Sequence, residues 1–195
     1  MEAKKIIAPI AQLDRASAYG AGCWWFDPTW AHQPHLFAFN MIFKKHAQFM
    51  QEALKEAKSA FREDDVPIGA VIVYKDKIIG RAHNQVERLK DPTAHAEMLA
   101  ITSAANSLNS KWLNGASLYV TIEPCSMCAG ALVLARIKNL IYGADDPKAG
   151  GCGSVTNIVN NKSLNHRIKV QKGILEKECS LLLKEFFKKK RSQQN

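Results

Sequence analysis

A chain of 195 residues is long enough for one domain with a hydrophobic core, whereas two full domains would be cramped. Hydrophobic residues make up 47% and charged residues 23% of the chain, which is typical of a globular protein and excludes overall disorder. The formal net charge of +9 at pH 7 favours contact with a polyanion such as nucleic acid, although a basic composition alone does not establish one.

The cysteines and the apolar segments indicate a cytoplasmic protein. Of the five cysteines, Cys125 and Cys128 stand close together, whereas Cys23, Cys152 and Cys179 are scattered and outline no disulfide framework. The sequence contains no run of about 18 apolar residues that would span a bilayer, and its start lacks the apolar core of a secretory signal. We therefore expect a reducing compartment and no membrane association.

The first forty residues show neither helical nor strand periodicity, because prolines and glycines interrupt them repeatedly. The stretch from Ala11 to His32 resembles the peptide obtained by translating a transfer-RNA gene upstream of a reading frame. We therefore expect an irregular N-terminal extension over residues 1–40, with translation starting at Met41, and one domain over residues 41–195. The alternative is a genuine lid or anchor, since exposed tryptophans mark interaction surfaces.

The domain begins with an amphipathic helix and a hairpin. From Phe49 to Phe61 apolar residues recur at steps of three and four, so this segment should cover one face of a sheet. The run Asp64-Asp65-Val66-Pro67 ends the helix. Residues 68–74 are rich in β-branched side chains and turn at residues 75–77 into a second strand, residues 78–80.

Strands and helices then alternate, which predicts an α/β fold with parallel crossovers. We expect Asp91 as N-cap and Pro92 as first residue of a helix ending near Asn109, and another helix over residues 125–136. Strands are expected at residues 117–122, 139–142 and 168–170, with a last helix from about Glu176 into the basic run 188–191. Both inner helices then start at carboxyl ends of strands, where open α/β sheets bind ligands.

The two helix starts carry residues suited to a metal. His95 supplies an imidazole, and Cys125 and Cys128 supply thiols at positions i and i+3, which share one helix face. A helix N-terminus favours the thiolate forms that bind metal. Structural zinc takes four protein ligands and catalytic zinc keeps three, so this set predicts catalytic zinc. Seen alone, the cysteines would equally suit a redox pair or half of a structural zinc site.

Glu97, two residues after His95, is suited to proton transfer. Zinc lowers the pKa of a bound water from about 15.7 to roughly 7, and a neighbouring carboxylate then moves protons to a ring nitrogen and a leaving amine. The order His-x-Glu followed by Pro-Cys-x-x-Cys is the pattern of zinc nucleobase deaminases. Taken alone, Glu97 would be a solvated acid of a first helical turn.

A glycine-rich loop, residues 143–153, carries Asp145, Asp146 and Lys148. It is either a flexible turn or a wall of the substrate cleft, and Asp146 and Lys148 are then candidates for substrate contact.

From about Phe49 to Arg191 the sequence resembles the bacterial tRNA-specific adenosine deaminases, which convert a wobble adenosine to inosine. The resemblance rests on five portions of the chain: residues 66–71, 91–97, 118–135, 165–167 (Asn-His-Arg), and 173–175 together with Cys179 and the Phe186-Phe187 pair. It implies a cytidine-deaminase-like three-layer α/β/α sandwich with a five-stranded mixed sheet, a homodimer with one Zn²⁺ per subunit, and a tRNA anticodon stem-loop as substrate. It also implies that Asn84 binds the flipped base, Ile68 lines the base pocket, and Asp146 lies near the preceding nucleotide.

The sequence departs from the family pattern at two RNA-contacting positions, with Gln85 in place of a common arginine and Ala149 in place of a threonine. These changes concern the RNA footprint more than the reaction. Two other functions remain open: deamination of a free base such as guanine or cytosine, and a noncatalytic zinc-stabilised RNA-binding module. Glu97 argues against the second, since a structural site has no need of a carboxylate beside an open position.

Overall fold

The computed structural model describes residues 34–193, which form five helices and one five-stranded sheet. The strands are β1 (Gly69–Tyr74), β2 (Lys77–His83), β3 (Ser117–Ile122), β4 (Asn139–Ala144) and β5 (Lys169–Lys172). The helices are α1 (Pro34–Arg62), α2 (Val86–Leu89), α3 (Ala96–Leu108), α4 (Ser126–Leu134) and α5 (Glu176–Gln193).

The sheet has the order β2-β1-β3-β4-β5 and is mixed. The predicted hairpin is present: β1 pairs antiparallel with β2 across a turn in which Lys75 and Asp76 both adopt positive φ, the geometry of a type I′ turn. β1 also runs antiparallel to β3, whereas β3, β4 and β5 are mutually parallel. Strands β2 and β3 are therefore parallel to each other, and the connections that contain α3 and α4 both begin at the carboxyl ends of these strands.

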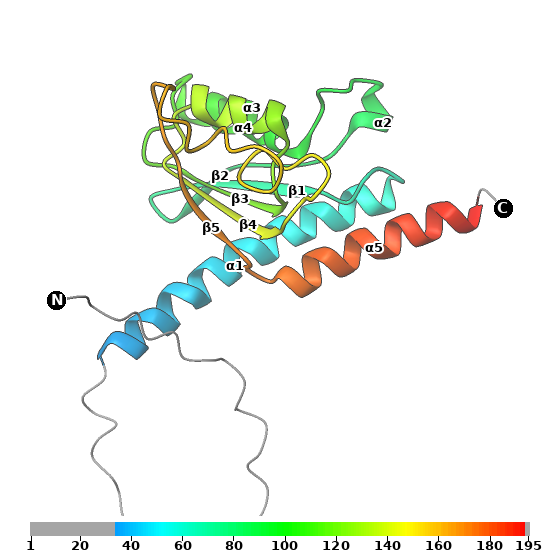
Figure 1. The fold of residues 1–195 in the computed structure, drawn as a ribbon, viewed down its shortest axis with the longest axis horizontal. Coiled ribbons are helices and arrows are strands. Elements are labelled where there is room, and N and C mark those ends of the chain that lie inside the picture. Colours follow the sequence, from blue (N-terminus) through cyan, green and yellow to red (C-terminus); the bar gives the residue numbers. More distant parts are fainter. Residues whose placement is uncertain (1–33, 194–195) are drawn as a thin grey trace, which may run out of the picture.

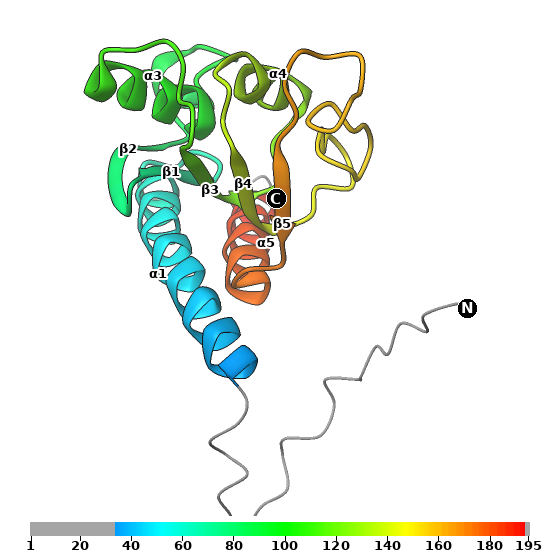
Figure 2. The same ribbon diagram turned by 90° about the vertical axis from the view of Figure 1, so that its left-hand side faces the viewer.

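The helices lie in two layers, with α1 and α5 on one face of the sheet and α3 and α4 on the other (Figures 1 and 2). Alternate strand residues feed two cores. Ile72, Leu118 and Leu140 face α3 and α4, whereas Val71, Val73 and Ile141 face α1 and α5. The structure confirms the predicted three-layer α/β/α sandwich with a five-stranded mixed sheet.

Two glycines allow these layers to approach closely. A Cβ atom added to Gly69 would collide with the carbonyl oxygen of Ala53 in α1, and one on Gly80 would lie 2.6 Å from that of Ala100 in α3. The opposing helix positions are also small, since Ala53, Ala57, Ala100 and Ala104 are fully buried. Backbone packs directly on backbone, and this sets the height of α3 above the sheet.

Several boundaries differ from the expectations. Helix α1 begins at Pro34, so residues 34–40 are helical where the sequence indicated no regular structure. Helix α3 begins at Ala96 with His95 as N-cap, not at Asp91, because the Asp91 carboxylate accepts hydrogen bonds from the backbone and hydroxyl of Thr93 and closes a separate turn. The polar connection after Asn84 contains the short helix α2.

The hypothesis that translation starts at Met41 concerns a segment that lies largely outside the described residues, and it stays a prediction. The tryptophans on which the alternative depends, Trp24 and Trp25 among them, also lie outside the described residues. Among the helices of residues 34–193, none combines the length and apolarity needed to cross a lipid bilayer.

Candidate metal centre and substrate pocket

The metal-ligand candidates occupy the N-caps of two neighbouring helices. His95 is the N-cap of α3 and Cys125 the N-cap of α4, and the backbone carbonyl of each accepts the first intrahelical hydrogen bond. In neither case does the side chain cap its own helix, although N-cap side chains commonly do so. Both are free to point at each other, and Cys128 joins them from the first turn of α4.

Three donor atoms converge as a cation site requires. His95 Nδ1 lies 3.6 Å from Cys125 Sγ and 3.5 Å from Cys128 Sγ. In a tetrahedral zinc site with bonds of about 2.0 Å to nitrogen and 2.3 Å to sulfur, these atoms stand roughly 3.6 Å apart. Within the described part of the chain, these three residues are the group of His, Cys, Asp and Glu side chains with metal-binding spacing. The donor set therefore fits a metal ion, as the sequence spacing predicted.

Hydrogen bonds within this group favour the thiolate form of Cys125. The Cys128 thiol and His95 each donate a hydrogen bond to Cys125. These bonds, the one from Cys128 having the larger effect, lower the pKa of Cys125 to about 3. The same contact, together with burial, raises the pKa of Cys128. The hydrogen bond to Cys125 also raises the pKa of His95, against the opposing effect of burial. A metal ion that takes all three ligands must displace the protons of Cys128 and His95, so its binding releases protons.

Glu97 lies in the first turn of α3 and is only 3% exposed. Burial raises the pKa of its carboxyl group. Its Oε2 atom is the one fully buried side-chain nitrogen or oxygen without a hydrogen-bond partner among residues 34–193. An unsatisfied buried carboxylate oxygen is costly, and such groups gather where chemistry takes place. This oxygen is available to a water or substrate atom at the metal centre.

Glu123, at the end of β3, is a functional candidate that the sequence analysis missed. It is 3% exposed, and its two oxygens accept hydrogen bonds from the backbone of Asp146, Cys152 and Ser154 and from the Ser154 hydroxyl. Burial acts to raise its pKa, but these hydrogen bonds together lower it. An acid directly after a buried strand and before Pro-Cys was a signal that could have identified it.

Glu123 holds the glycine-rich loop against the metal centre. Gly150 forms an antiparallel bridge with Cys125, and the Gly151 backbone donates to the carbonyl of Pro124 at 2.8 Å. A Cβ atom on Gly150 would lie 2.5 Å from the Glu123 carboxyl carbon. The loop therefore packs tightly beside the metal-ligand residues and forms one wall of the site. Asp146 is half-buried and accepts hydrogen bonds from the backbone of Lys148 and Ala149, while the Lys148 side chain is exposed.

A pocket of about 250 Å³ opens beside His95, between the start of β1, the end of β2 and α2. Both sequence-predicted pocket residues line it, Ile68 from the start of β1 and Asn84 from the end of β2. Asn84 is 3% exposed, and its amide nitrogen donates to Asp65, another lining residue that the sequence analysis did not single out as functional. The partner of Asp65 lies nineteen positions away, so no local pattern marks the pair.

A larger groove of about 600 Å³ adjoins this pocket and shares Val66 and Glu87 with it. It runs between the end of α1, the α2 connection and the C-terminal part of α5. Its wall combines acidic, basic and aromatic side chains: Glu63, Asp64, Glu87, Arg88, Lys90, Phe186, Phe187, Lys190 and Arg191. The diagnostic phenylalanine pair of the last helix therefore lies beside the candidate substrate pocket.

Comparison with known proteins identifies the family. The family model of the MafB19-like deaminases matches residues 44–191. A tRNA-specific adenosine deaminase from Aquifex aeolicus is 57% identical over 144 residues, which span 74% of this chain and 95% of that protein. This chain belongs to the tRNA-specific adenosine deaminase family. A further member, from Bacillus subtilis, is 48% identical over 143 residues, covering 73% of this chain and 89% of that protein.

The fold of the tRNA-specific adenosine deaminase family extends over most of the described residues. A solved structure from work on A-to-I editing by tRNA:A34 deaminases at the wobble position of transfer RNA superposes with a TM-score of 0.68 at 45% identity. The match covers 70% of this chain and 99% of that one. Membership in this family, which the sequence motifs indicated, is confirmed.

Proposed function

We propose that this chain deaminates the wobble adenosine of a tRNA anticodon by hydrolysis, giving inosine and ammonia. The observation that carries the proposal is the buried Glu97 carboxylate, whose free oxygen lies beside a His-Cys-Cys donor set at the edge of a pocket. A structural metal site does not need this carboxylate. Relatives at 48–57% identity to this chain carry the name of this activity.

His95, Cys125 and Cys128 would hold one Zn²⁺ per subunit. When bound, the ion supplies a Lewis acid that makes water nucleophilic at neutral pH. Glu97 is the catalytic residue: it takes one proton from the attacking water and delivers it to the purine ring nitrogen, and then moves the second proton of that water from the new hydroxyl to the leaving amine, which departs as ammonia. Burial suits it to this role, because its raised pKa brings the carboxyl closer to the pH at which it must both accept and donate.

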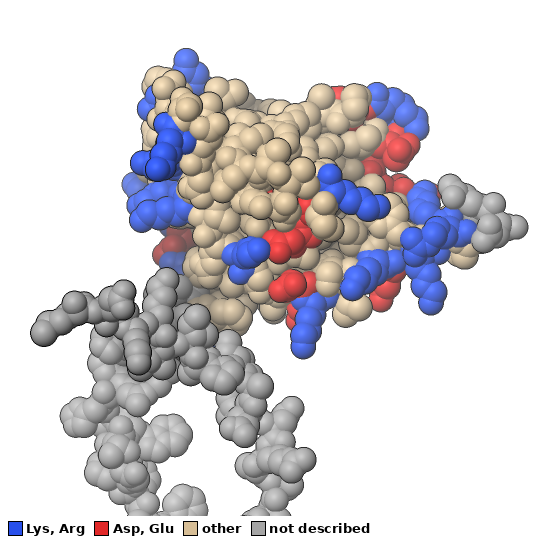
Figure 3. Space-filling model, viewed as in Figure 1, with Lys and Arg blue, Asp and Glu red and all other residues tan. Residues whose placement is uncertain are grey.

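Substrate recognition is assigned to the pocket and its surroundings. Asn84 would hydrogen-bond the flipped base, and Ile68 would contact the face of its ring. Asp146 and Lys148 would lie near the nucleotide before the target. The groove with Arg88, Lys190 and Arg191 suits the phosphates of a single-stranded anticodon loop, and exposed Phe187 offers a stacking surface for a base. Figure 3 shows lysines and arginines gathered over this end of α5.

A homodimer accords with an apolar surface on the α4 side. Leu134 is 79% exposed, and Trp112 and Leu164 are also exposed around a shallow cavity of about 230 Å³ that includes His166 of the Asn-His-Arg segment. Contiguous exposed apolar side chains mark association surfaces. Light scattering of the purified protein should give the mass of a dimer, and Leu134→Asp should shift it toward a monomer.

The function is tested by incubating the zinc-loaded protein with total tRNA and sequencing the tRNA for inosine, in parallel with free guanine, cytosine and adenosine. Inosine at an anticodon wobble position, with ammonia released in equal amount, is the expected result. Turnover of free guanine or cytosine with none on an anticodon stem-loop would overturn the proposal. A tRNA modification enzyme acts where mature tRNA resides, so we place this protein in the cytoplasm.

A further inference from the structure

Asp65 is the most thoroughly buried carboxylate beside the pocket, with 1% of its surface exposed. Its place is fixed by the end of α1. Asp64 adopts a left-handed conformation with φ of 61°, the Asp65 amide donates to the carbonyl of Ala60 at 2.9 Å, and the Asp64 amide donates to that of Phe61. These are the bonds of a Schellman motif. The backbone of Asp65 is therefore anchored to the helix that covers the far face of the sheet.

The carboxylate of Asp65 collects three donors from the pocket wall. Oδ1 accepts the Val66 amide and Nδ2 of Asn84, each at 2.8 Å, and Oδ2 accepts the Glu87 amide at 2.8 Å. Glu87 belongs to the first turn of α2, whose N-cap Gln85 makes no side-chain capping bond. Asp65 therefore caps the N-terminus of α2, although it lies in the connection between α1 and β1. Asn84, Val66 and Glu87 all line the pocket, so the Asp65 side chain links three residues of the pocket wall.

This contact also decides which way the Asn84 amide faces. An ionised carboxylate only accepts hydrogen bonds, so the nitrogen end of Asn84 must point to Asp65. The second amide hydrogen and the carbonyl oxygen are left for a ligand in the pocket. A rotated amide would place its oxygen against a carboxylate oxygen, which is repulsive, and would present the pocket with the opposite pattern of donors and acceptors.

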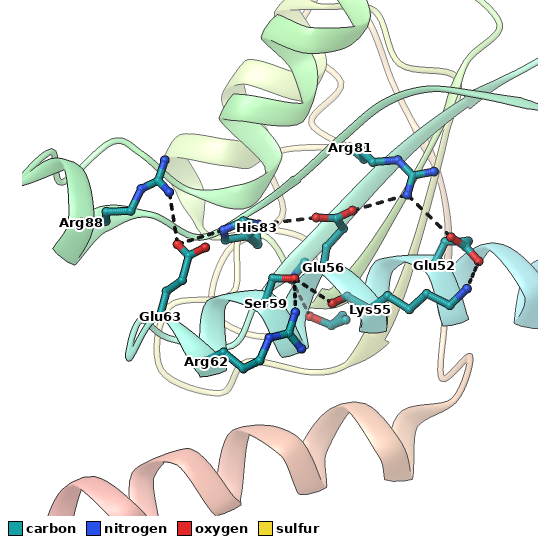
Figure 4. A network of polar contacts seen from close by, with 11 residues as sticks. Glu52, Lys55, Glu56, Ser59, Arg62, Glu63, Arg81, His83 and Arg88 are labelled. Atoms are coloured by element: carbon teal, nitrogen blue, oxygen red, sulfur yellow. Dashed lines mark hydrogen bonds and ion pairs between the residues drawn. The ribbon is translucent and has the colours of Figure 1, made fainter.

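The outer surface of the same turn is joined to α2 by an ion pair and to β2 by hydrogen bonds of His83 (Figure 4). Glu63 approaches Arg88 at 3.5 Å and Nε2 of His83 at 3.2 Å, and Nδ1 of His83 lies 3.5 Å from Glu56. These contacts are partly solvated, and pairs of this kind contribute little each. They hold the turn in place from its outer side, but none of them is a hydrogen bond to Asn84.

We propose that Asp65 is a positioning residue that sets the orientation of the Asn84 amide and thereby the hydrogen-bond pattern read from the substrate base. The inference rests on the proposed function, because it takes Asn84 as the base-binding residue. Asp65 acts through Asn84 and does not itself contact the base.

The test is a double-mutant cycle on the zinc-loaded full chain, with Asp65→Asn, Asn84→Ala and the two combined, measured on an anticodon stem-loop. Asp65→Asn keeps the size of the side chain but lets the Asn84 amide rotate. It should lower kcat/KM by roughly 10- to 100-fold, as misplacement of a substrate-orienting group does. The double variant should be no slower than Asn84→Ala alone. Asp91→Asn, at an exposed turn carboxylate between α2 and α3, is the matched control and should leave kcat/KM within about twofold.

A second measurement does not depend on activity. The Asn84 side-chain amide hydrogens, followed by NMR, should exchange slowly in the wild type and fast in Asp65→Asn, with zinc content unchanged. The positioning role is refuted if the two substitutions multiply in their effects, or if amide exchange is the same in both proteins. If the wild type and Asp91→Asn make no inosine, the proposed function fails instead, and the exchange measurement still decides whether Asp65 orients Asn84.

Discussion

At the scale of single residues, the sequence indicated the side chains that we propose to carry the reaction, but it did not single out the carboxylates that support them. His95, Glu97, Cys125 and Cys128 were predictable because each carries a reactive group and lies at a spacing that helix starts bring together. Asp65 and Glu123 are buried, with 1% and 3% of their surface exposed, but their roles depend on partners nineteen and more residues away. Only folding brings those donors to them, so no local pattern marks Asp65, whereas the place of Glu123 directly after a buried strand and before Pro-Cys was a usable signal.

The first prediction concerns Glu97. Glu97→Ala should retain the metal, because the three donor atoms belong to other residues, and should lose turnover by about 10²- to 10⁴-fold, the range of general acid–base catalysis. Zinc content is measured by atomic emission and turnover by inosine formed in an anticodon stem-loop. Cys128→Ser is the contrasting variant, which should lose the metal together with activity. A Glu97→Ala protein that sheds its zinc or deaminates normally would contradict the assigned role.

At the scale of elements, helix and strand types were predictable from periodicity, but several helix starts were not. Asp91-Pro92 has the composition of a helix N-terminus, yet Asp91 closes its own turn and α3 starts with His95. The choice is made by tertiary contacts, because His95 must meet the two cysteines of α4. Short helix α2 has no sequence signal of its own, and its N-terminus is stabilised by Asp65.

Close packing between elements leads to the second prediction. Gly69→Ala places a methyl group against the α1 backbone, so it should destabilise the fold by about 1–3 kcal/mol, as overpacking does. Gly130→Ala is the control, because a Cβ there meets no atom within 4 Å and alanine favours the helix. Urea unfolding of both variants measures the difference. Equal stability would mean that α1 can move away from the sheet freely.

The third prediction concerns the attachment of the loop. Glu123→Gln removes the charge that four donors share, and it should cost about 2 kcal/mol of stability at pH 7. Folding lowers the Glu123 pKa below its ordinary 4.5, so the stabilisation is present above pH 4.5 and disappears as the pH falls through the folded-state pKa. The gap between wild type and variant should therefore narrow in acid.

Unfolding by urea at a series of pH values tests this. Asp145→Asn is the control in the same loop: this exposed carboxylate contacts the Tyr142 hydroxyl and the exposed Lys172, so its loss should cost less than about 1 kcal/mol at every pH. A gap that stays constant or widens in acid would show that the Glu123 carboxylate is not the source of the stabilisation.

At the scale of the whole molecule, the net charge of +9 predicted a polyanionic partner but not its place. The structure locates a groove with four basic side chains where the end of α5 meets the α2 connection, next to the pocket. α1 and α5 also meet there, since Asp64 pairs with Lys190 at 2.7 Å. Segments more than a hundred residues apart thus form one surface, which composition alone could not reveal.

The fourth prediction follows from this surface. Removing two charges with Lys190→Ala and Arg191→Ala should weaken binding of an anticodon stem-loop. It should also reduce the slope of log K against log salt concentration by up to about 2, because each phosphate that a cation neutralises adds roughly 0.9 to that slope. Lys77→Ala with Lys138→Ala removes the same charge at the amino ends of β2 and β4, opposite the strand ends that carry the pocket, and should leave the slope unchanged. Identical slopes for both double variants would exclude the groove from RNA binding.

Gly150 and Gly151 limit how this enzyme can be engineered to act on other nucleic acids. Side chains at either position would collide with Glu123 or with the start of α4, so a mutant library that randomises them will mostly return inactive clones. Val155 is 56% exposed and is held through its backbone, whose amide donates to the carbonyl of Gly150 at 3.1 Å. Substitutions at Val155 can change the exposed surface of the loop while the bridge between Gly150 and Cys125 is kept.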